Sequence, residues 1–208
     1  MADCNSVNNP IVPGTKLMKD LMGEQVDYTF YKQPVGSLMY LTSTRSDLLY
    51  VVGLLNRYMA HPTTFHLQAA KHVLRYIKGT TTFGVFYRQG GNHQLVGYSD
   101  SDYAGDVEDR RSTLGFQFLL SSGVVSWSSR KQPIVKLSTT EAEFVTAFAC
   151  ACQAVWLRRM MEQLDQTQSG ATMIYCDNSS TIKLSRNPVM HDRSKHIDVR
   201  FHFLRDLT

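Results

Sequence analysis

Three acidic residues in separate segments have the types and the spacing to bind divalent cations together. Asp100 ends one apolar run, Glu143 lies at the start of a helical pattern, and Asp177 directly follows another apolar run. Phosphodiester hydrolysis by a two-metal route needs several carboxylates at one point, because they must hold two ions about 4 Å apart. In an open α/β sheet, ligands gather at strand ends beside a helix start. The set is therefore typical of a metal-dependent hydrolase, and a nuclease is one candidate among several.

Each of these acids also has an ordinary structural explanation. Asp100 can start a turn, Glu143 can interact with the helix dipole, and Asp177 can be an N-cap. Two neighbouring acids rank lower as ligands. An extended chain carries Asp102 past the strand end, and Glu141 points elsewhere around its helix. Only the combination of the three favours a metal site.

The segments around these acids predict an α/β order. Strand-like runs occupy residues 95–99, 116–120, 124–128 and 171–176, and a Ser-Ser-Gly connection at 121–123 predicts a hairpin. A long helix is expected from a cap at residues 138–140 to Leu164. A short helix that Asp177 or Asn178 can cap is expected to reach Leu184. Trp127 and Trp156 lie in apolar patterns, so we expect both in the core.

The N-terminal part predicts helices that follow an extended lead-in. Residues 1–33 contain several prolines and glycines and no sustained period. Between residues 36 and 60 the spacing predicts two helices, and Thr63 or Thr64 can cap a third that ends at Lys78-Gly79. A short strand is expected at 83–87, followed by a linker. We therefore divide the chain into a lead-in (1–33), a helical segment (34–92) and an α/β domain (93–208).

Composition sets wide limits on function. Of 208 residues, 43% are hydrophobic and the net charge is +4, so we expect a folded protein with a mild preference for anionic partners. The four cysteines show no zinc-finger spacing, which indicates neither a disulfide framework nor a structural zinc site. We find no signal peptide and no apolar run of about 20 residues, and therefore expect a soluble intracellular protein without a membrane partner.

Ordered motifs along the chain resemble one known family. The C-terminal motifs, between Gly97 and Asp206, are GYSDSDYAGD, DRRSTLGFQFLL, VVSWSSRKQP, LSTTEAEF, VWLRRM, YCDNSSTI and SKHIDVRFHFLRD. In this order they resemble the RNase H domain of copia-type retrotransposon Pol polyproteins. The N-terminal motifs PVGSLMYLTSTRSDLLYVVGLLNRYM and AAKHVLRYIKGT are similar to the connecting segment that follows the reverse transcriptase palm in the same polyproteins.

The resemblance implies a fold, a reaction and a set of site residues. The fold is an α/β RNase H-like mixed sheet with flanking helices, preceded by a small helical segment. The reaction is two-metal endonuclease cleavage of the RNA strand of an RNA/DNA hybrid with Mg²⁺ or Mn²⁺. Asp100 matches the first metal-binding aspartate, Glu143 the helix glutamate, and Asp177 the aspartate that closes the fourth strand. The remaining reverse transcriptase polypeptide is the implied partner, in a cytoplasmic virus-like particle or in the nucleus.

The sequence also departs from the family pattern. RNase H folds continue with a fifth strand and a C-terminal helix that carries a fourth aspartate, whereas this sequence ends at Thr208. We therefore expect the last strand, that helix and the fourth ligand to be missing, and Asp198 to make a surface salt bridge rather than bind an ion. No Tyr-x-Asp-Asp segment occurs, so we expect no polymerase activity. Whether three carboxylates suffice for cleavage stays open, and the alternative is a non-catalytic relic or a domesticated nucleic-acid-binding protein.

Basic side chains are candidates for phosphate contacts. In the α/β part they are Arg110, Arg111, Arg130, Lys131, Lys183, Arg186, Arg193 and Lys195. Contacts to hybrid phosphates would make binding salt-dependent, and the competing interpretation is a soluble surface. The third predicted helix has a basic side with Lys71, His72, Arg75 and Lys78, for which a solvated face is favoured over a nucleic-acid contact.

Overall fold

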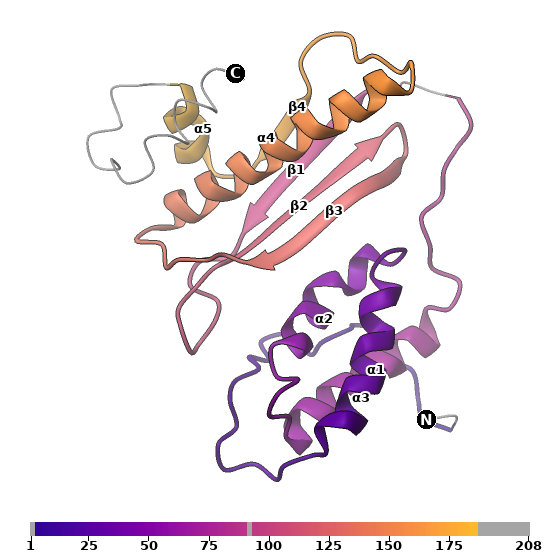
Figure 1. Cartoon of the computed structure of the whole chain (residues 1–208), viewed down its shortest axis with the longest axis vertical. Helices are drawn as coiled ribbons and strands as arrows, with labels where there is room; N and C mark the ends of the chain where they lie inside the picture. The colour runs from indigo at the N-terminus through magenta and orange to yellow at the C-terminus, as the bar shows by residue number, and fades with distance from the viewer. Residues whose placement is uncertain (1–2, 91–92, 187–208) are drawn as a thin grey trace. The chain divides into compact units, whose positions relative to one another are not determined.

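The computed structural model describes residues 3–90 and 93–186, and the chain divides into two compact units, Met1–Val85 and Phe86–Thr208 (Figure 1). Residues 187–208, which include Arg193, Lys195 and Asp198, lie outside the described residues. Among the described residues, no helix combines the length and apolar character that a membrane span requires.

The first unit is helical. Its elements are α1 (Tyr28–Leu41), the 3-10 helix η1 (Ser46–Leu48), α2 (Leu49–Asn56) and α3 (Thr64–Gly79). Tyr31, Val35 and Leu55 are fully buried in its core, where the Tyr31 hydroxyl donates to the Leu55 carbonyl at 3.1 Å. Helix α3 begins after its N-cap Thr63, as predicted, because Thr63 and His66 form a capping box.

Helix α1 begins inside the segment that was expected to be an extended lead-in. Asp27 caps it by accepting a hydrogen bond from the Thr29 N–H at 2.9 Å. Tyr31, Val35 and Leu38 then lie on one buried face, although Pro34 stands inside the helix. Proline normally disfavours a helix interior because it lacks an N–H. Burial of the apolar face outweighs that local penalty here.

The basic side of α3 holds the N-terminal segment of the same unit. Lys78 Nζ donates to the Cys4 carbonyl at 2.8 Å, and Arg75 Nε donates to the Asn5 carbonyl at 2.7 Å. His72 Nε2 lies 3.0 Å from the Asn9 carbonyl oxygen. Three side chains that were expected on a solvated face therefore bind backbone carbonyls of the chain itself.

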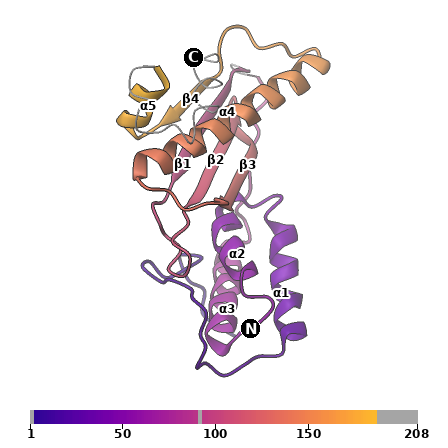
Figure 2. The same cartoon turned by 60° about the vertical axis from the view of Figure 1, so that its left-hand side comes forward.

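The second unit contains a mixed sheet. Its elements are β1 (Leu95–Ser101), β2 (Thr113–Leu120), β3 (Gly123–Lys131), α4 (Thr139–Gln163), β4 (Met173–Cys176) and α5 (Ser179–Arg186). The strand order is β3-β2-β1-β4; β1 pairs antiparallel with β2 and parallel with β4. Figures 1 and 2 show α4 lying across one face of this sheet. A mixed sheet with flanking helices is the α/β fold class that the sequence predicted.

Helix α4 is positioned by its cap and by its buried face. Ser138 Oγ accepts a hydrogen bond from the Glu141 N–H at 3.1 Å, which confirms the predicted start of the helix. Phe144 and Phe118 are both fully buried in cores beneath α4. Gly97 is required on β1, because a Cβ at that position would lie 2.8 Å from a ring carbon of Phe118.

Two local predictions are wrong. Residues 83–87 form no strand, and Phe83 and Phe86 are exposed. An alternating pattern alone provides no hydrogen-bonding partner, and no described strand pairs with this segment. Trp156 is 53% exposed, because it lies on the outer face of α4 with Cys152 and Arg159. Trp127 is only partly buried on β3.

Candidate active site

Glu143 is the buried member of the predicted carboxylate set. It lies in the second turn of α4 and is 3% exposed. Its Oε1 accepts a hydrogen bond from the backbone N–H of Ser101, at the end of β1, at 3.1 Å. Its Oε2 is buried and has no hydrogen-bond partner among the described residues. A buried carboxylate oxygen with no partner is costly in a folded protein, so the position is a candidate for cation binding.

Asp177 and Cys176 meet Glu143 where β4 ends. One potential ligand atom from each of these three side chains lies within 4.8 Å of the others. Asp177 is exposed, whereas Cys176 is partly buried. The structure thus brings two of the three predicted carboxylates together.

Asp100 lies near this group but not within it. It is exposed on β1, paired in register with Gly115 of β2, and its neighbour Ser99 is in register with Cys176 of β4. Its charge raises the pKa of Glu143, as does the charge of Asp177. Asp100 therefore acts on Glu143 through its charge, but it is not part of the group of ligand atoms that Glu143, Cys176 and Asp177 form.

The electrostatics of Glu143 differ from those of a carboxylate in an ion pair. Burial raises its pKa most strongly, the Ser101 N–H opposes this, and the negative charges of Asp100 and Asp177 add to the rise, so that the pKa reaches about 7. None of the three carboxylates forms an ion pair with a described residue. A cation in this place would remove the repulsion that raises the pKa.

The ordinary explanations for these acids do not match the structure. The N-cap of α5 is Asn178, whose Oδ1 accepts from the Thr181 N–H at 2.9 Å, so Asp177 is not needed as a cap. Asp100 lies within β1 rather than in a turn. Glu143 binds the backbone of β1 instead of the N-terminal N–H groups of its own helix.

The two acids that were ranked lower have structural partners instead. Asp102 Oδ1 accepts from the Thr113 N–H at 2.8 Å and from the Gly105 N–H at 3.3 Å. Glu141 Oε2 accepts from the Leu137 N–H at 2.9 Å, and its Oε1 lies 3.5 Å from Lys136 Nζ. Both therefore stabilise loops beside the site.

Cys176 is the residue that the sequence reasoning missed. Burial raises its thiol pKa most, hydrogen bonds to the Asn178 N–H and to Ser99 oppose this, and the charges of Glu143 and Asp177 raise it further. The signal was period-two alternation along β4. Ile174, two positions earlier, packs into the core under α4, so Cys176 shares that face of the sheet.

A buried amide fixes the end of β1 against α4. Gln132 is fully buried, and its Nε2 donates to the Ala142 carbonyl at 3.1 Å, to Ser101 Oγ at 3.3 Å and to Thr146 Oγ1 at 3.4 Å. Because Ser101 also donates to Glu143, these contacts hold the strand and the helix in the register that orients the carboxylate.

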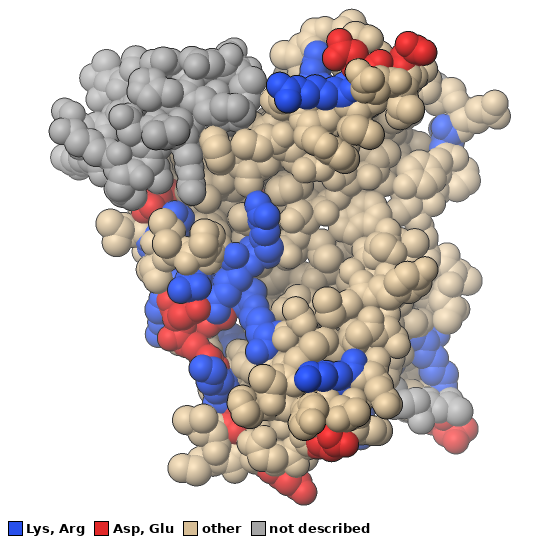
Figure 3. Space-filling model, in the orientation of Figure 1, with Lys and Arg blue, Asp and Glu red and all other residues tan. Residues whose placement is uncertain are grey.

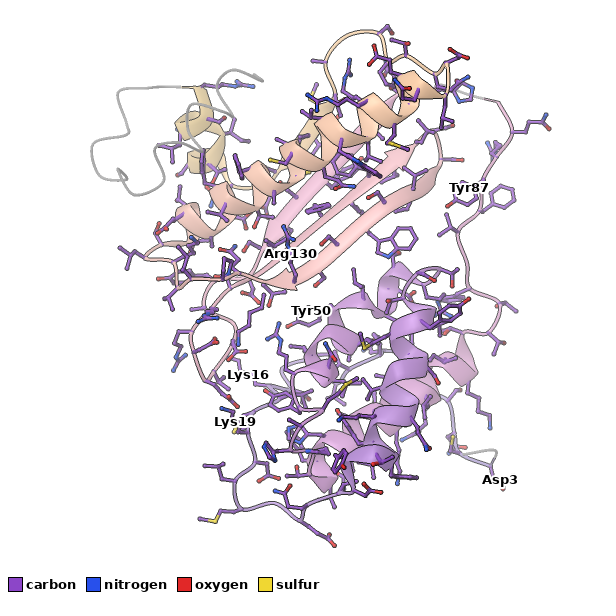
Figure 4. The ribbon with its side chains drawn as sticks, viewed as in Figure 1. Asp3, Lys16, Lys19, Tyr50, Tyr87 and Arg130 are labelled. Carbon is purple, nitrogen blue, oxygen red and sulfur yellow. The ribbon has the colours of Figure 1, made fainter. Side chains whose placement is uncertain are left out.

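Two basic residues that were candidates for phosphate contacts, Lys131 and Arg111, pair with acids instead. Lys131 Nζ lies 2.7 Å from both Asp106 and Asp109 oxygens, and Arg111 Nε lies 3.5 Å from Asp109. In Figure 3, red and blue side chains lie together where the β1–β2 loop projects in Figure 1. Arg130, labelled in Figure 4, is exposed near the end of β3.

The donor atoms present fit a divalent cation. Carboxylate oxygens are the ligands that Mg²⁺ and Mn²⁺ prefer, and the unpartnered Glu143 Oε2 is such an oxygen. Asp177 and Asp100 supply further oxygens from exposed positions, which leaves room for water or a substrate. These residues are therefore candidates for holding a hard cation at a place open to solvent.

Sequence comparison finds relatives over almost the whole chain. The chain is 38% identical over 214 residues to the retrovirus-related Pol polyprotein from transposon TNT 1-94 of Nicotiana tabacum, covering 100% of this chain and 16% of that protein. It is 39% identical over 206 residues to the retrovirus-related Pol polyprotein from transposon RE1 of Arabidopsis thaliana, covering 99% of this chain and 14% of that protein. The chain thus spans about a sixth or less of the length of these polyproteins.

A shorter relative matches part of the chain. Secreted RxLR effector protein 161 of Plasmopara viticola is 48% identical over 128 residues, which cover 61% of this chain and 90% of that protein. No protein-family model matches the chain, and no solved structure matches it.

Proposed function

Since this chain belongs to the copia-type family of retrovirus-related Pol polyproteins, we propose that its second unit is their RNase H-type endonuclease. The substrate is the RNA strand of an RNA/DNA hybrid, cleaved with Mg²⁺ or Mn²⁺. The remaining reverse transcriptase polypeptide of the element is the proposed partner.

One observation carries this proposal: Glu143 and Asp177 converge beside Cys176, Asp100 acts on the same point, and none of the three carboxylates is neutralised by a described cationic side chain. A buried carboxylate whose pKa is raised by burial and by neighbouring like charges is typical of functional sites. Metal-dependent phosphodiester hydrolysis is a function that uses such a group.

Each residue has a distinct role in this proposal. Glu143, oriented through Oε1 by the Ser101 N–H, offers Oε2 as a ligand from inside the protein. Asp177 and Asp100 offer oxygens from exposed strand ends, where a nucleic-acid backbone has access. Glu143, Asp177 and Asp100 would hold two divalent ions, which would supply activation of a water molecule and stabilisation of the leaving 3′ oxygen. Gln132 is a positioning residue, because it acts only through Ser101 and α4.

The test is magnesium-dependent cleavage of a hybrid whose RNA strand is fluorescently labelled, at pH 8, where Glu143 is ionised. The full chain is compared with Asp177→Asn, and we expect the variant to cleave at least about 100-fold more slowly. The matched control is Asp165→Asn, an exposed acid at a positive φ of 57° that asparagine also adopts. The control should cleave at the wild-type rate, and equal activity of wild type and Asp177→Asn would reject the assignment.

A non-catalytic nucleic-acid-binding protein is the second candidate. The observation in its favour is the similarity to secreted RxLR effector protein 161 of Plasmopara viticola, 90% of which is covered by the match. Binding of the hybrid by the full chain, without turnover in either Mg²⁺ or Mn²⁺, would favour this candidate over the nuclease.

A further inference from the structure

A thiol stands among the carboxylates at the end of β4. The Sγ of Cys176 and one carboxylate oxygen each of Glu143 and Asp177 lie within 4.8 Å of one another. Two of the three side chains come from adjacent positions of one strand end, and the third reaches them from α4. A site that serves only Mg²⁺ has no use for sulfur, because Mg²⁺ is bound through oxygen.

The second observation is the state of Glu143. The side chain is 3% exposed, and within the part of the chain that the structure describes its buried Oε2 has no hydrogen-bond partner. Ser101 satisfies only Oε1. The cluster therefore contains a buried oxygen that lacks the partner such an atom normally has, next to a sulfur and a second carboxylate.

We propose that Glu143, Cys176 and Asp177 form a binding site for a thiophilic divalent cation of the Zn²⁺ class. Zn²⁺ binds cysteine sulfur and carboxylate oxygen, and sites that keep an exchangeable position use three protein ligands. Sulfur selects such ions over Mg²⁺. Because Asp177 is exposed, solvent can reach the ion, and a water molecule can be its fourth ligand. When the ion binds, the thiol proton leaves to solvent and the sulfur binds as thiolate.

The measured separations suit this ligand set after a small adjustment. Zn–O bonds of about 2.0–2.2 Å and Zn–S bonds of about 2.3 Å place ligand atoms about 3.5 Å apart around a tetrahedral ion. Because the three ligand atoms lie within 4.8 Å of one another, a closure of no more than about 1 Å brings them to this spacing. Asp177 is exposed and follows the last residue of β4, so its side chain can rotate without disturbing the core.

The site shares two ligands with the proposed nuclease. Glu143 and Asp177 serve both ions, so a Zn²⁺-class ion and the catalytic Mg²⁺ exclude each other. That regulatory consequence rests on the proposed function, whereas binding of the ion does not. A thiophilic ion should inhibit cleavage at concentrations far below the Mg²⁺ concentration that the reaction requires. The reason is that the sulfur ligand raises the affinity of the site for the thiophilic ion and not for Mg²⁺.

Cobalt provides a direct test, because Co²⁺ replaces Zn²⁺ and a thiolate ligand gives a charge-transfer absorption band in the near ultraviolet. The full chain is titrated with Co²⁺ under reducing conditions and without nucleic acid. We expect the band in the wild-type chain, its loss in Cys176→Ser, and its retention in Cys152→Ser. Cys152 is the matched control, because it is an exposed cysteine of the same unit outside the cluster.

A second variant keeps the test decisive if Cys176→Ser does not fold. Asp177→Asn retains the thiol, so the band should form at a Co²⁺ concentration at least about tenfold higher. Absence of the band in the wild-type chain overturns the proposal, as does an unchanged band in Cys176→Ser. Because the band is read without substrate, its result is independent of whether the chain cleaves hybrids, and failure of cleavage with a normal band would count against the nuclease alone.

Discussion

Carboxylates gather in two regions of the second unit, the loop between β1 and β2 and the ends of β1 and β4. The surroundings lower the carboxyl pKa in the loop and raise it at the strand ends. In the loop, Asp106 accepts from the N–H groups of Glu108 and Asp109, and Lys131 pairs with it at 2.7 Å. Burial alone would raise the pKa of Asp106, yet these partners lower it to about 2. At the strand ends the corresponding partners are missing among the described residues, and the pKa of Glu143 rises to about 7.

The number of hydrogen-bond and ion-pair partners distinguishes acids that stabilise the fold from candidate metal ligands in the second unit. A carboxylate that stabilises a loop is satisfied by backbone donors and a cation of the same chain. Glu143 has a single backbone donor, an unpartnered oxygen and two like charges nearby. Such a carboxylate lowers the stability of the protein in the absence of a ligand. We therefore expect that replacing Glu143 lowers the activity and raises the free energy of unfolding.

The largest expected effect is on activity, and it compares two neighbouring aspartates. Asp100→Asn should slow hybrid cleavage at least about 100-fold, equal to about 3 kcal/mol of transition-state stabilisation. Asp102→Asn should cleave within about threefold of wild type, because the amide oxygen can still accept from the Thr113 and Gly105 N–H groups. Single-turnover rates of both variants measure the difference. Equal losses in the two would show that Asp100 has no special role.

The next effect is on stability, and its sign is unusual for a buried polar residue. Below about pH 4.5 the Glu143 carboxyl is protonated in both folded and unfolded chains, so it contributes no penalty. Between that value and about 7 the folded state retains a proton that the unfolded state has released, so stability falls as pH rises. Above pH 7 the full penalty, about 3 kcal/mol, is present.

Glu143→Gln removes that penalty while its amide oxygen can still accept from Ser101. In the presence of a chelator we expect the variant to be more stable than wild type by about 3 kcal/mol at pH 8, and equal to it at pH 4. Urea unfolding at the two pH values measures this. A destabilised variant at pH 8 would contradict the repulsion that distinguishes this region from the loop.

The smallest expected effect is on stability and comes from the β1–β2 loop. Replacing its acid lowers the free energy of unfolding, whereas replacing Glu143 raises it. Asp106→Asn removes the ion pair with Lys131 and should destabilise the fold by about 2 kcal/mol at pH 7. Because the folded pKa is lowered, the stabilisation is present above about pH 3.8 and is lost as pH falls toward about 2. The stabilities of wild type and variant should therefore converge only at about pH 2 and below, where Asp106 is protonated in the folded state as well. A constant difference across this range would indicate lost packing rather than lost charge.

Much of the fold could be predicted because its signals are local. The sequence predicted caps among residues 138–140 and at Thr63 or Thr64, and the structure has Ser138 and Thr63 there, since an N-cap needs only the residues that follow it. Tertiary contacts decided the rest. Helix α1 extends through Pro34 because its apolar face is buried, and the alternation at 83–87 forms no strand because no described strand pairs with it. Trp156 was expected in the core, although it lies on the outer face of α4.

The candidate site was predicted in part. Asp100, Glu143 and Asp177 were chosen from strand ends and a helix start, and the structure brings Glu143 and Asp177 together. The sequence did not predict that Asp100 lies outside that group or that Cys176 belongs to it. Both depend on the parallel register of β1 and β4, in which Ser99 pairs with Cys176. The predicted role of the three carboxylates stays a prediction, and Asp198 lies outside the described residues.

The most direct test of the account is hybrid cleavage by Glu143→Gln, measured with Mg²⁺ at pH 8 on protein whose folding has been verified in the same buffer. We predict that wild type cleaves the RNA strand only when Mg²⁺ is present, and that the variant, although more stable, loses at least about 100-fold in rate. A stable Glu143→Gln chain that cleaves as fast as wild type would show that these carboxylates do not form a catalytic metal site.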